Sequence, residues 1–275
     1  MSKLKLSLCI ASADQDIFDD AVHHAVRNKT LLPGQPSLLH GIYGFGNGRE
    51  LKPVSPHLDV RMNVQSVPEN MGVPYALHKL YEMAEPATDE EDHILAYIHD
   101  DVRILEPGWD ARVLKVFQDH PECGLAGFGG ATGLGGSEIY KVPYEIHQLG
   151  RRDFYSNMRG AEVHGHRTTT EMPIVFTDGF SMILRKSLLD KIGGWSWWPF
   201  SLVHHAYDYG IACMARRHGY TAWLVPCDVE HRGGMTACGP IHQNMAQKYG
   251  GDTAVHTASH RFVYETFRDV LPIRL

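Results

Sequence analysis

Two adjacent carboxylates that follow a short apolar run are the residues of this chain best suited to chemistry. Asp100 and Asp101 come directly after the mostly apolar segment 94–98. Such a run predicts a strand buried on both faces of a sheet, and ligands bind at the carboxyl ends of strands in open α/β sheets. Carboxylates there must reach water or find a cation or donors, and Mg²⁺ or Mn²⁺ carrying a diphosphate would satisfy them. The alternative is a solvated turn in which Asp101 acts as a cap.

Strand-like and helix-like segments alternate around this pair, and they must position it. Strands are expected near 4–10, 37–43, 60–64, 94–98, 124–128, 174–176, 180–184 and 221–225, and helices near 15–28, 74–84, 108–119, 187–192 and 207–218. This alternation predicts an α/β protein with a mainly parallel central sheet flanked by helices. The glycines of 44–48 predict a turn, and the weak periodicity of 129–172 predicts a long functional or mobile loop.

Composition excludes several classes of protein. The 275 residues carry a formal net charge of −6, so there is no overall basic field to attract nucleic acid. No apolar run is long enough to span a membrane, and the N-terminus lacks the features of a signal peptide. The five cysteines are odd in number and form no C-x-x-C pattern. They predict buried free thiols and a cytoplasmic location.

Common nucleotide-binding and hydrolase motifs are missing. Neither the glycine-rich segment 124–136 nor residues 44–48 contain G-x-G-x-x-G or the P-loop pattern, and no G-x-S-x-G occurs. Dinucleotide-binding, kinase and serine-hydrolase functions are therefore disfavoured.

The order and spacing of several short motifs resemble a family 2-type glycosyltransferase of the GT-A fold, the Rossmann-like fold of nucleotide-diphospho-sugar transferases. The matching positions are Asn70 and Gly72, Asp100 and Asp101, Asp178 and Gly179, Ile192 to Trp195, Tyr207 and Asp208, Gly219 and Tyr220, Pro226, and His231. The resemblance places a GT-A domain at residues 1–235, followed by a C-terminal helical extension at 236–275 packed on the same domain. Two positions depart from the family pattern, because His99 replaces a carboxylate and the helix start reads Tyr-Asp instead of Glu-Asp.

The resemblance implies metal-assisted transfer of a sugar from a nucleotide diphosphate, with a UDP-sugar as the default donor and Mn²⁺ or Mg²⁺ as the cofactor. It implies that Asp101 and His231 ligate the metal, although His231 could instead lie on the surface. Asp100 would bind the ribose or a metal-bound water. The remaining nucleotide contacts are expected from Ala11, Ser12, Asp14, Asn70 and Gly72.

Three further groups are candidates for catalysis and sugar binding. Asp208 is the expected general base of an inverting displacement. The alternative is that Asp208 is there only because the helix dipole favours a carboxylate at a helix N-terminus. Asp178 and Gly179 are expected to orient the donor or acceptor sugar. Trp195 and Trp198 could stack on a sugar, or they could simply fill the core.

The sequence does not identify the acceptor, for which a glycan or another molecule with a hydroxyl group is expected. The arginines of the irregular region, Arg151, Arg152, Arg159 and Arg167, permit an anionic acceptor such as a hydroxylated base in DNA, or they pair with nearby acids. A homo-oligomer is compatible with the sequence. Two other functions stay open: a nucleotidyltransferase of related fold, and a non-catalytic protein that binds sugar nucleotides.

Overall fold

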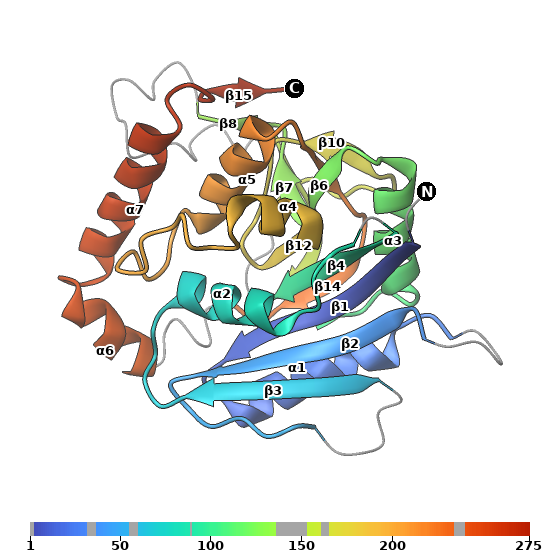
Figure 1. Cartoon of the computed structure of the whole chain (residues 1–275), viewed down its shortest axis with the longest axis horizontal. Coiled ribbons are helices and arrows are strands. Elements are labelled where there is room, and N and C mark those ends of the chain that lie inside the picture. The colour runs from blue at the N-terminus through green and yellow to red at the C-terminus, as the bar shows by residue number, and fades with distance from the viewer. Residues whose placement is uncertain are drawn as a thin grey trace.

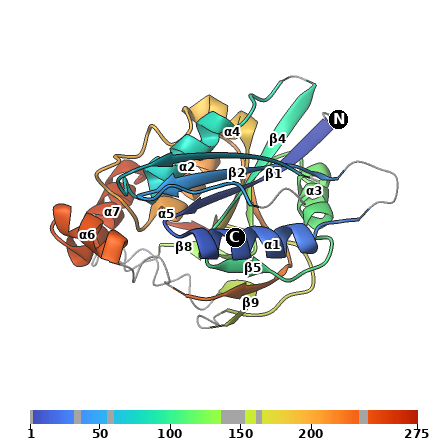
Figure 2. The same cartoon turned by 90° about the horizontal axis from the view of Figure 1, so that it is seen from below.

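A central eight-stranded sheet forms the middle layer of the molecule, with helices on both faces (Figures 1 and 2). The computed structural model describes residues 3–31, 37–54, 60–88, 90–135, 153–160, 165–233 and 240–275, with the side chains of 240–243 excepted. The strand order is β10-β13-β6-β12-β4-β1-β2-β3. These strands are β1 (Lys3–Ser12), β2 (Leu39–Asn47), β3 (Arg61–Val67), β4 (Glu91–Ile98), β6 (Cys123–Gly127), β10 (Met172–Ile174), β12 (Ser181–Arg185) and β13 (Thr221–Leu224).

Helices cover the two faces of this sheet in separate groups. In Figure 2, α2 and α4 lie on one face, and α1 and α3 lie on the other. The helices are α1 (Gln15–Arg27), α2 (Val73–Met83), α3 (Trp109–Asp119), α4 (Lys186–Ile192), α5 (Tyr207–Arg217), α6 (Pro240–Lys248) and α7 (Asp252–Thr266). The expected helices in the first 220 residues are therefore confirmed, with ends that differ by at most one residue.

Residues 94–98 of strand β4 are all apolar because they contribute to both hydrophobic cores. Ile94, Ala96 and Ile98 belong to the core on the side of α1 and α3. Leu95 and Tyr97 alternate with them and belong to the core formed with α2, α4 and α5. Since side chains of a strand point alternately to the two faces, a strand covered on both sides needs apolar residues at every position. The predicted doubly buried strand is confirmed.

The sheet is mixed. Strands β1, β2, β3 and β4 are paired in parallel, as are β6 and β13. Strand β12 runs antiparallel between β4 and β6, and β10 is antiparallel to β13. Four of the seven pairings are thus parallel, and the carboxyl ends of β1 and β4 meet at one edge of the sheet.

A second sheet of five strands is built partly from the region that was expected to be a loop. Its order is β11-β7-β9-β14-β5. The expectation of a structureless segment at 129–172 is wrong for its described residues, because β7 and β9 pair with each other there. The strands are β5 (Val102–Ile104), β7 (Gly129–Ala131), β9 (Phe154–Gly160), β11 (Phe176–Thr177) and β14 (Asp228–His231).

The C-terminal helices lie beside the body of the protein, on the left of Figure 1. Val263 of α7 and Phe267 after it are fully buried in the same core as α2 and α5. The chain then ends in β15 (Ile273–Arg274), which pairs with β8 (Gly133–Leu134). Among the described residues, no helix is long and apolar enough to cross a membrane.

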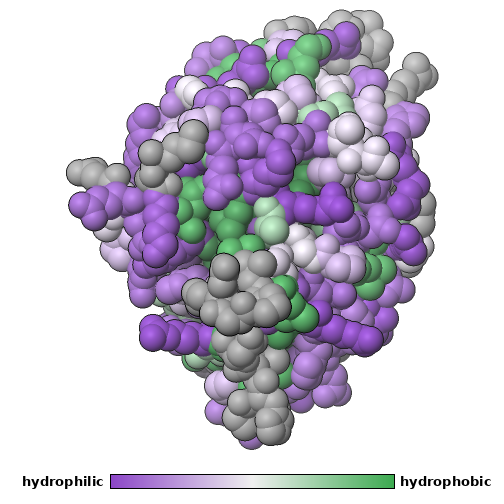
Figure 3. Space-filling model, turned by 90° about the vertical axis from the view of Figure 1, so that its right-hand side faces the viewer, coloured by the Kyte–Doolittle hydropathy of each residue, from purple (hydrophilic) through white to green (hydrophobic). Residues whose placement is uncertain are grey.

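The face of the molecule on the right of Figure 1 is mainly hydrophilic. Figure 3 shows that its visible apolar patches are small and separated by polar side chains. The cysteines at positions 9, 123, 213 and 227 are buried and free, as expected, while Cys238 lies outside the described residues.

Gly72 brings the loop before α2 against the segment that precedes α5. Its backbone has a φ of +86°, and a Cβ atom there would lie 2.6 Å from the carbonyl oxygen of Val203. We expect Gly72→Ala to lower the free energy of unfolding by about 2–5 kcal/mol, because it adds overpacking to a backbone conformation, with ψ at 167°, that is essentially restricted to glycine. Urea unfolding monitored by circular dichroism measures this loss.

Gly219→Ala is the matched control for this prediction. Gly219 has a φ of +83°, but no atom lies within 4 Å of the added Cβ. Its substitution should therefore cost only about 1–2 kcal/mol, which is the contribution of the backbone alone. Equal losses for the two variants would show that the contact between Gly72 and Val203 is not tight.

Candidate active site

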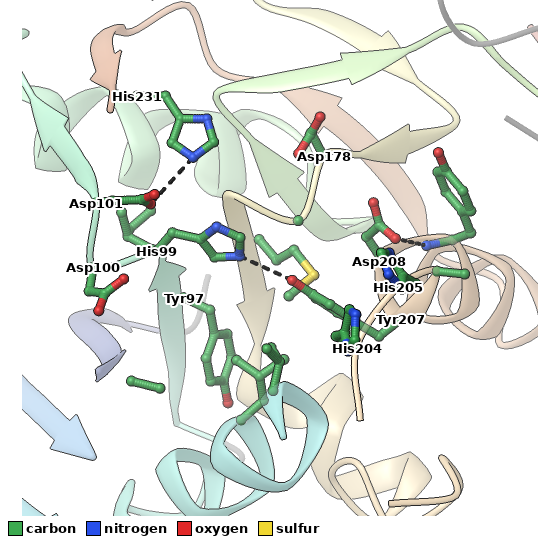
Figure 4. Close-up of a pocket in the computed structure, with 18 of the residues that line it drawn as sticks. Tyr97, His99, Asp100, Asp101, Asp178, His204, His205, Tyr207, Asp208 and His231 are labelled. Atoms are coloured by element: carbon green, nitrogen blue, oxygen red, sulfur yellow. Dashed lines mark hydrogen bonds and ion pairs between the residues drawn. The ribbon is translucent and has the colours of Figure 1, made fainter. Parts of the chain in front are cut away.

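A cavity of about 450 Å³ opens at the carboxyl ends of β1 and β4. Four aspartates from separate parts of the chain line it: Asp100, Asp101, Asp178 and Asp208 (Figure 4). The described lining contains histidines but neither lysine nor arginine. The described lining is therefore rich in carboxylates.

The acidic pair lies where two parallel strands end. Cys9 of β1 is in register with Tyr97 of β4, so the residues that follow each strand come close together. The Ser12 hydroxyl donates a hydrogen bond of 2.5 Å to Oδ2 of Asp100. Asp100 and Asp101 are only 6% and 5% exposed, so the alternative of a solvated turn is wrong.

A strand pairing in the second sheet brings His231 to Asp101. Strand β14 is antiparallel to β5, which places His231 opposite Val102, and Arg232 N–H donates to the Asp101 carbonyl at 3.0 Å. Nε2 of His231 then lies 3.3 Å from Oδ1 of Asp101. The predicted pair of metal ligands is thus adjacent and buried.

His99 completes a group of three possible ligands. One ligand atom each from His99, Asp101 and His231 lie within 4.8 Å of one another. Nε2 of His99 is 3.0 Å from the Tyr207 hydroxyl (Figure 4). Burial raises the pKa of Tyr207 well above its ordinary value, so the phenol stays neutral, and its oxygen can accept a hydrogen bond from Nε2–H of His99. That arrangement leaves Nδ1 of His99 as the basic nitrogen.

Asp178 and Asp208 lie on the other side of the cavity in Figure 4. Asp178 sits between β11 and β12, and Asp208 lies in the first turn of α5, where its Oδ1 accepts a hydrogen bond of 2.9 Å from Tyr209 N–H. Desolvation of the carboxyl group, with a further contribution from the negative charge of Asp178, raises the pKa of Asp208 to about 7. A carboxylate with this pKa is a much stronger base than an ordinary one.

The predicted nucleotide contacts at the end of β1 differ in their positions. Ala11 lines the cavity, and Ser12 reaches it through its bond to Asp100. Asp14 instead caps helix α1, because its Oδ1 accepts from the N–H groups of Asp16 and Ile17 at 2.9 and 3.2 Å. Asp14 therefore acts as the N-cap of α1 and is not part of the cavity lining.

Asn70 and Gly72 shape the loop before α2 and do not line the cavity. Oδ1 of Asn70 accepts from Gly72 N–H at 2.9 Å and from the side-chain amide of Asn47 at 3.0 Å. The residue after this loop, Val73, does line the cavity. The loop thus acts on the site through the position of α2.

Core packing accounts for two of the predicted sugar-binding tryptophans. Trp195 and Trp198 are 0% and 1% exposed, and neither lines the cavity. Trp195 packs edge-on against Tyr97. These positions do not support the expectation that Trp195 and Trp198 contact a sugar. Both side chains instead pack in the core, which was the alternative. Gly179 does line the cavity, beside Asp178.

The arginines of the irregular region are paired where the structure describes them. Arg159 and Arg167 both form ion pairs with Asp228, the second at 2.8 Å. These contacts fit the alternative of pairing with nearby acids. Arg151 and Arg152 lie outside the described residues.

Several residues of the cavity had no expected role. They include Tyr97, Met182 and four histidines, His204, His205, His256 and His260. Only Ala206 separates the first two histidines from Tyr207 and Asp208, so their closeness to the expected base could be read from the sequence. The other two come from α7, and only the fold brings them to the cavity.

A family model described as "Glycosyltransferase like family" matches residues 72–248, well over half of the chain. No curated protein matches it. GalNAc-T7 with UDP, GalNAc and Mn²⁺ is a similar solved structure, with a TM-score of 0.54 and 12% identity. That match covers 96% of this chain and 57% of the other, so this chain spans little more than half of that one.

The TarS 1-349 fragment of S. aureus is also similar. It gives a TM-score of 0.51 and 9% identity, covering 97% of this chain and 72% of that one. The same fragment in complex with UDP-GlcNAc gives 0.50 and 7%, covering 97% and 73%. At these identities the likeness shows the fold.

Proposed function

Since this chain belongs to the glycosyltransferase-like family whose model matches it, we propose that its aspartate-lined cavity binds a nucleotide-sugar through a divalent ion and transfers the sugar to a hydroxyl. The predicted GT-A fold and the enzyme class, a glycosyltransferase, are confirmed by the family match and by the likeness of fold. The donor, the acceptor and the stereochemical outcome are the parts that we propose.

The charge of the cavity is the observation that carries this proposal. Four aspartates line it, and its described lining holds no lysine or arginine. A diphosphate would be repelled by these carboxylates unless a cation lay between them. A divalent ion with few protein ligands, completed by phosphate oxygens, is how Mg²⁺ and Mn²⁺ usually bind such substrates.

The residues present fit such an ion. Asp101 offers a carboxylate oxygen, and His231 and His99 offer imidazole nitrogens within 4.8 Å of it and of each other. All three line the cavity. When bound there, the ion would supply Lewis-acid stabilisation of the leaving diphosphate. Asp100, held by Ser12, is placed to bind the ribose or a water on the ion.

Asp208 is the proposed general base. In an inverting displacement the acceptor oxygen forms a bond to the anomeric carbon, while the bond from that carbon to the phosphate oxygen breaks. The proton of the acceptor hydroxyl passes to the Asp208 carboxylate. Asp178 lies near enough for its charge to affect Asp208, and it is placed to orient the reacting sugar. A UDP-sugar is the donor to test first, because the GalNAc-T7 and TarS structures hold UDP or UDP-GlcNAc.

A thermal-shift panel of nucleotide sugars, with and without Mn²⁺, tests the proposal. A ligand that binds only the native state raises the melting temperature by mass action. We expect one donor to raise it when Mn²⁺ is present and not when a chelator is added. A panel with no shift for any nucleotide sugar would contradict the donor site.

Nucleotide release separates catalysis from the non-catalytic alternative. With the donor found in the panel, the enzyme should release the nucleoside diphosphate slowly to water. Binding without any release, with or without candidate acceptors, would favour a binding protein. Conversion of the same donor and added pyrophosphate into a nucleoside triphosphate and a sugar 1-phosphate would instead indicate a nucleotidyltransferase.

Tyr207→Phe should weaken the binding of Mn²⁺ by about 10-fold. The phenol orients the His99 ring through a 3.0 Å hydrogen bond, and loss of such a partner usually costs about 10–100-fold in metal affinity. Calorimetric titration with Mn²⁺ measures the change, and Tyr249→Phe at an exposed position is the control. An unchanged Mn²⁺ affinity would mean that His99 does not ligate the ion.

A further inference from the structure

A second group of histidines lies at the edge of the same cavity, on the side of the C-terminal helices. Nε2 of His204 is 2.6 Å from Oδ1 of Asp252, and Nε2 of His205 is 3.0 Å from the same oxygen. One ligand atom from each of the three residues lies within 4.8 Å of the other two. This group shares no residue with the Asp101 site.

Helix α7 adds two more imidazoles to this group. Asp252, His256 and His260 are spaced four residues apart, so they lie along one face of the helix. The rings of His205 and His256 are centred 4.9 Å apart, and those of His256 and His260 are 4.0 Å apart. Both helical histidines line the cavity.

The backbone that presents His205 is held in an uncommon conformation. His205 and Ala206 have φ values of 65° and 55°, and they are the non-glycine residues with positive φ among those that the structure describes. Such strain persists only where surrounding contacts enforce it, and it is concentrated at functional sites. Here it turns the His204–His205 segment toward α7, just before Asp208.

The hydrogen bond of His260 leaves a basic nitrogen available for a metal ion. Nδ1 of His260 is 2.8 Å from the His256 carbonyl, which holds the proton on Nδ1 and leaves Nε2 as the basic nitrogen.

We propose that His204, His205 and Asp252 form a second metal site, with His256 and His260 as neighbouring imidazole donors, that takes a borderline d-block ion such as Zn²⁺. With His256 and His260 nearby, this donor set is rich in imidazole, which suits Zn²⁺, Cu²⁺, Ni²⁺ and Fe²⁺. At the Asp101 site, phosphate oxygens of the donor would add the oxygen ligands that Mg²⁺ and Mn²⁺ favour. The bound ion would tie the start of α7 to the segment before α5. It would therefore fix one wall of the cavity and the approach to Asp208, independently of the sugar that is transferred.

Binding of Co²⁺ to the full-length, metal-stripped protein tests this site, because Co²⁺ reports its ligands through visible absorption. We expect two Co²⁺ ions per wild-type chain, one at each group. His231→Ala should lose one ion and keep the other. His205→Asn and Asp252→Asn should each lower the affinity for the second ion by at least about 100-fold. Loss of a hydrogen-bond partner of a ligand already costs about 10–100-fold in metal affinity, and these substitutions remove a ligand itself.

His205→Asn is chosen because asparagine tolerates a positive φ, so the fold should be kept. Melting of the metal-free variant checks this, and His218→Asn, at the end of α5, is the matched control. The proposal is overturned if His205→Asn and Asp252→Asn bind as many Co²⁺ ions as the wild type with equal affinity. It is also overturned if His231→Ala removes all binding, because the histidine group would then be only a hydrogen-bonded contact between α7 and α5.

Discussion

Asp208→Asn is expected to lower the rate of sugar transfer by about 10²–10⁴-fold, which is the usual contribution of a general base. The amide keeps the shape of the carboxylate but cannot accept a proton from the acceptor hydroxyl. Donor binding should change little, because the metal ligands are untouched. Initial rates at saturating donor, together with thermal shifts by the donor, measure the two effects separately.

Asp16→Asn is the matched control, because Asp16 is also a carboxylate in the first turn of a helix but lies exposed on α1. This control loses the favourable interaction with the helix dipole and nothing at the cavity. If Asp208→Asn transferred sugar at the wild-type rate, Asp208 would only be a helix-start carboxylate.

The same substitution should stabilise the fold at higher pH. The pKa of Asp208 is about 7 in the folded protein and near 3.8 when unfolded, so the folded state prefers the protonated carboxyl. Wild-type stability is therefore lost as the pH rises from about 4 through 7. Asp208→Asn cannot ionise, and its melting temperature relative to wild type should be higher at pH 8 than at pH 4.

The pH dependence of the wild-type reaction follows from the same pKa. The base must be ionised to accept a proton, so kcat should fall about tenfold for each pH unit below its pKa. A bound divalent ion lowers the pKa of nearby carboxyl groups, so the midpoint of this limb is expected at or below about pH 7. A rate that rises as the pH falls from 7 to 5 would contradict Asp208 as the base.

Asp101→Asn and His231→Ala are each expected to abolish metal-dependent transfer, with a loss of at least about 10³-fold at a fixed Mn²⁺ concentration. A Lewis-acid ion supplies several kcal/mol of stabilisation to the developing charge, and about 4 kcal/mol corresponds to 10³-fold. Asp101 and His231 are adjacent and buried, so each substitution removes a proposed ligand directly from the site. Initial rates over a Mn²⁺ series measure the loss.

Asp119→Asn, at the exposed end of α3, and His218→Asn provide controls for these variants. A chelator should inactivate the wild type, and added Mn²⁺ should restore it. Wild-type activity of Asp101→Asn in the presence of chelator would show that no ion is needed at this position.

The sequence identified the elements whose signals are local. Strand β4 was predictable because a short, continuous apolar run between polar residues is typical of a strand covered on both faces. Helix α1 was predictable because Asp14 marks its start and the spacing of apolar residues marks its buried face. The turn expected at 44–48 was wrong, since β2 continues to Asn47. Gly44 is needed there because a Cβ would lie 2.7 Å from the ring of Phe18, a contact that only the folded structure reveals.

Contacts between distant segments account for what was missed. Strands β7 and β9 are short and rich in polar or small residues, and they become strands only by pairing within the second sheet. His99 becomes a candidate metal ligand only in the folded structure, where β14 brings His231 close to it. The sequence left open whether Trp195 and Trp198 stack on a sugar or fill the core. Their burial follows from the packing of α2, α4 and α5 around them.

Calorimetric titration of UDP into the wild-type protein, with Mn²⁺ and then with a chelator, tests most directly whether this cavity holds a nucleotide donor through an ion. We predict binding with Mn²⁺, loss of that binding with the chelator, and equal loss in Asp101→Asn with Mn²⁺ present. UDP binding of the same affinity in all three conditions would contradict the metal-dependent donor site.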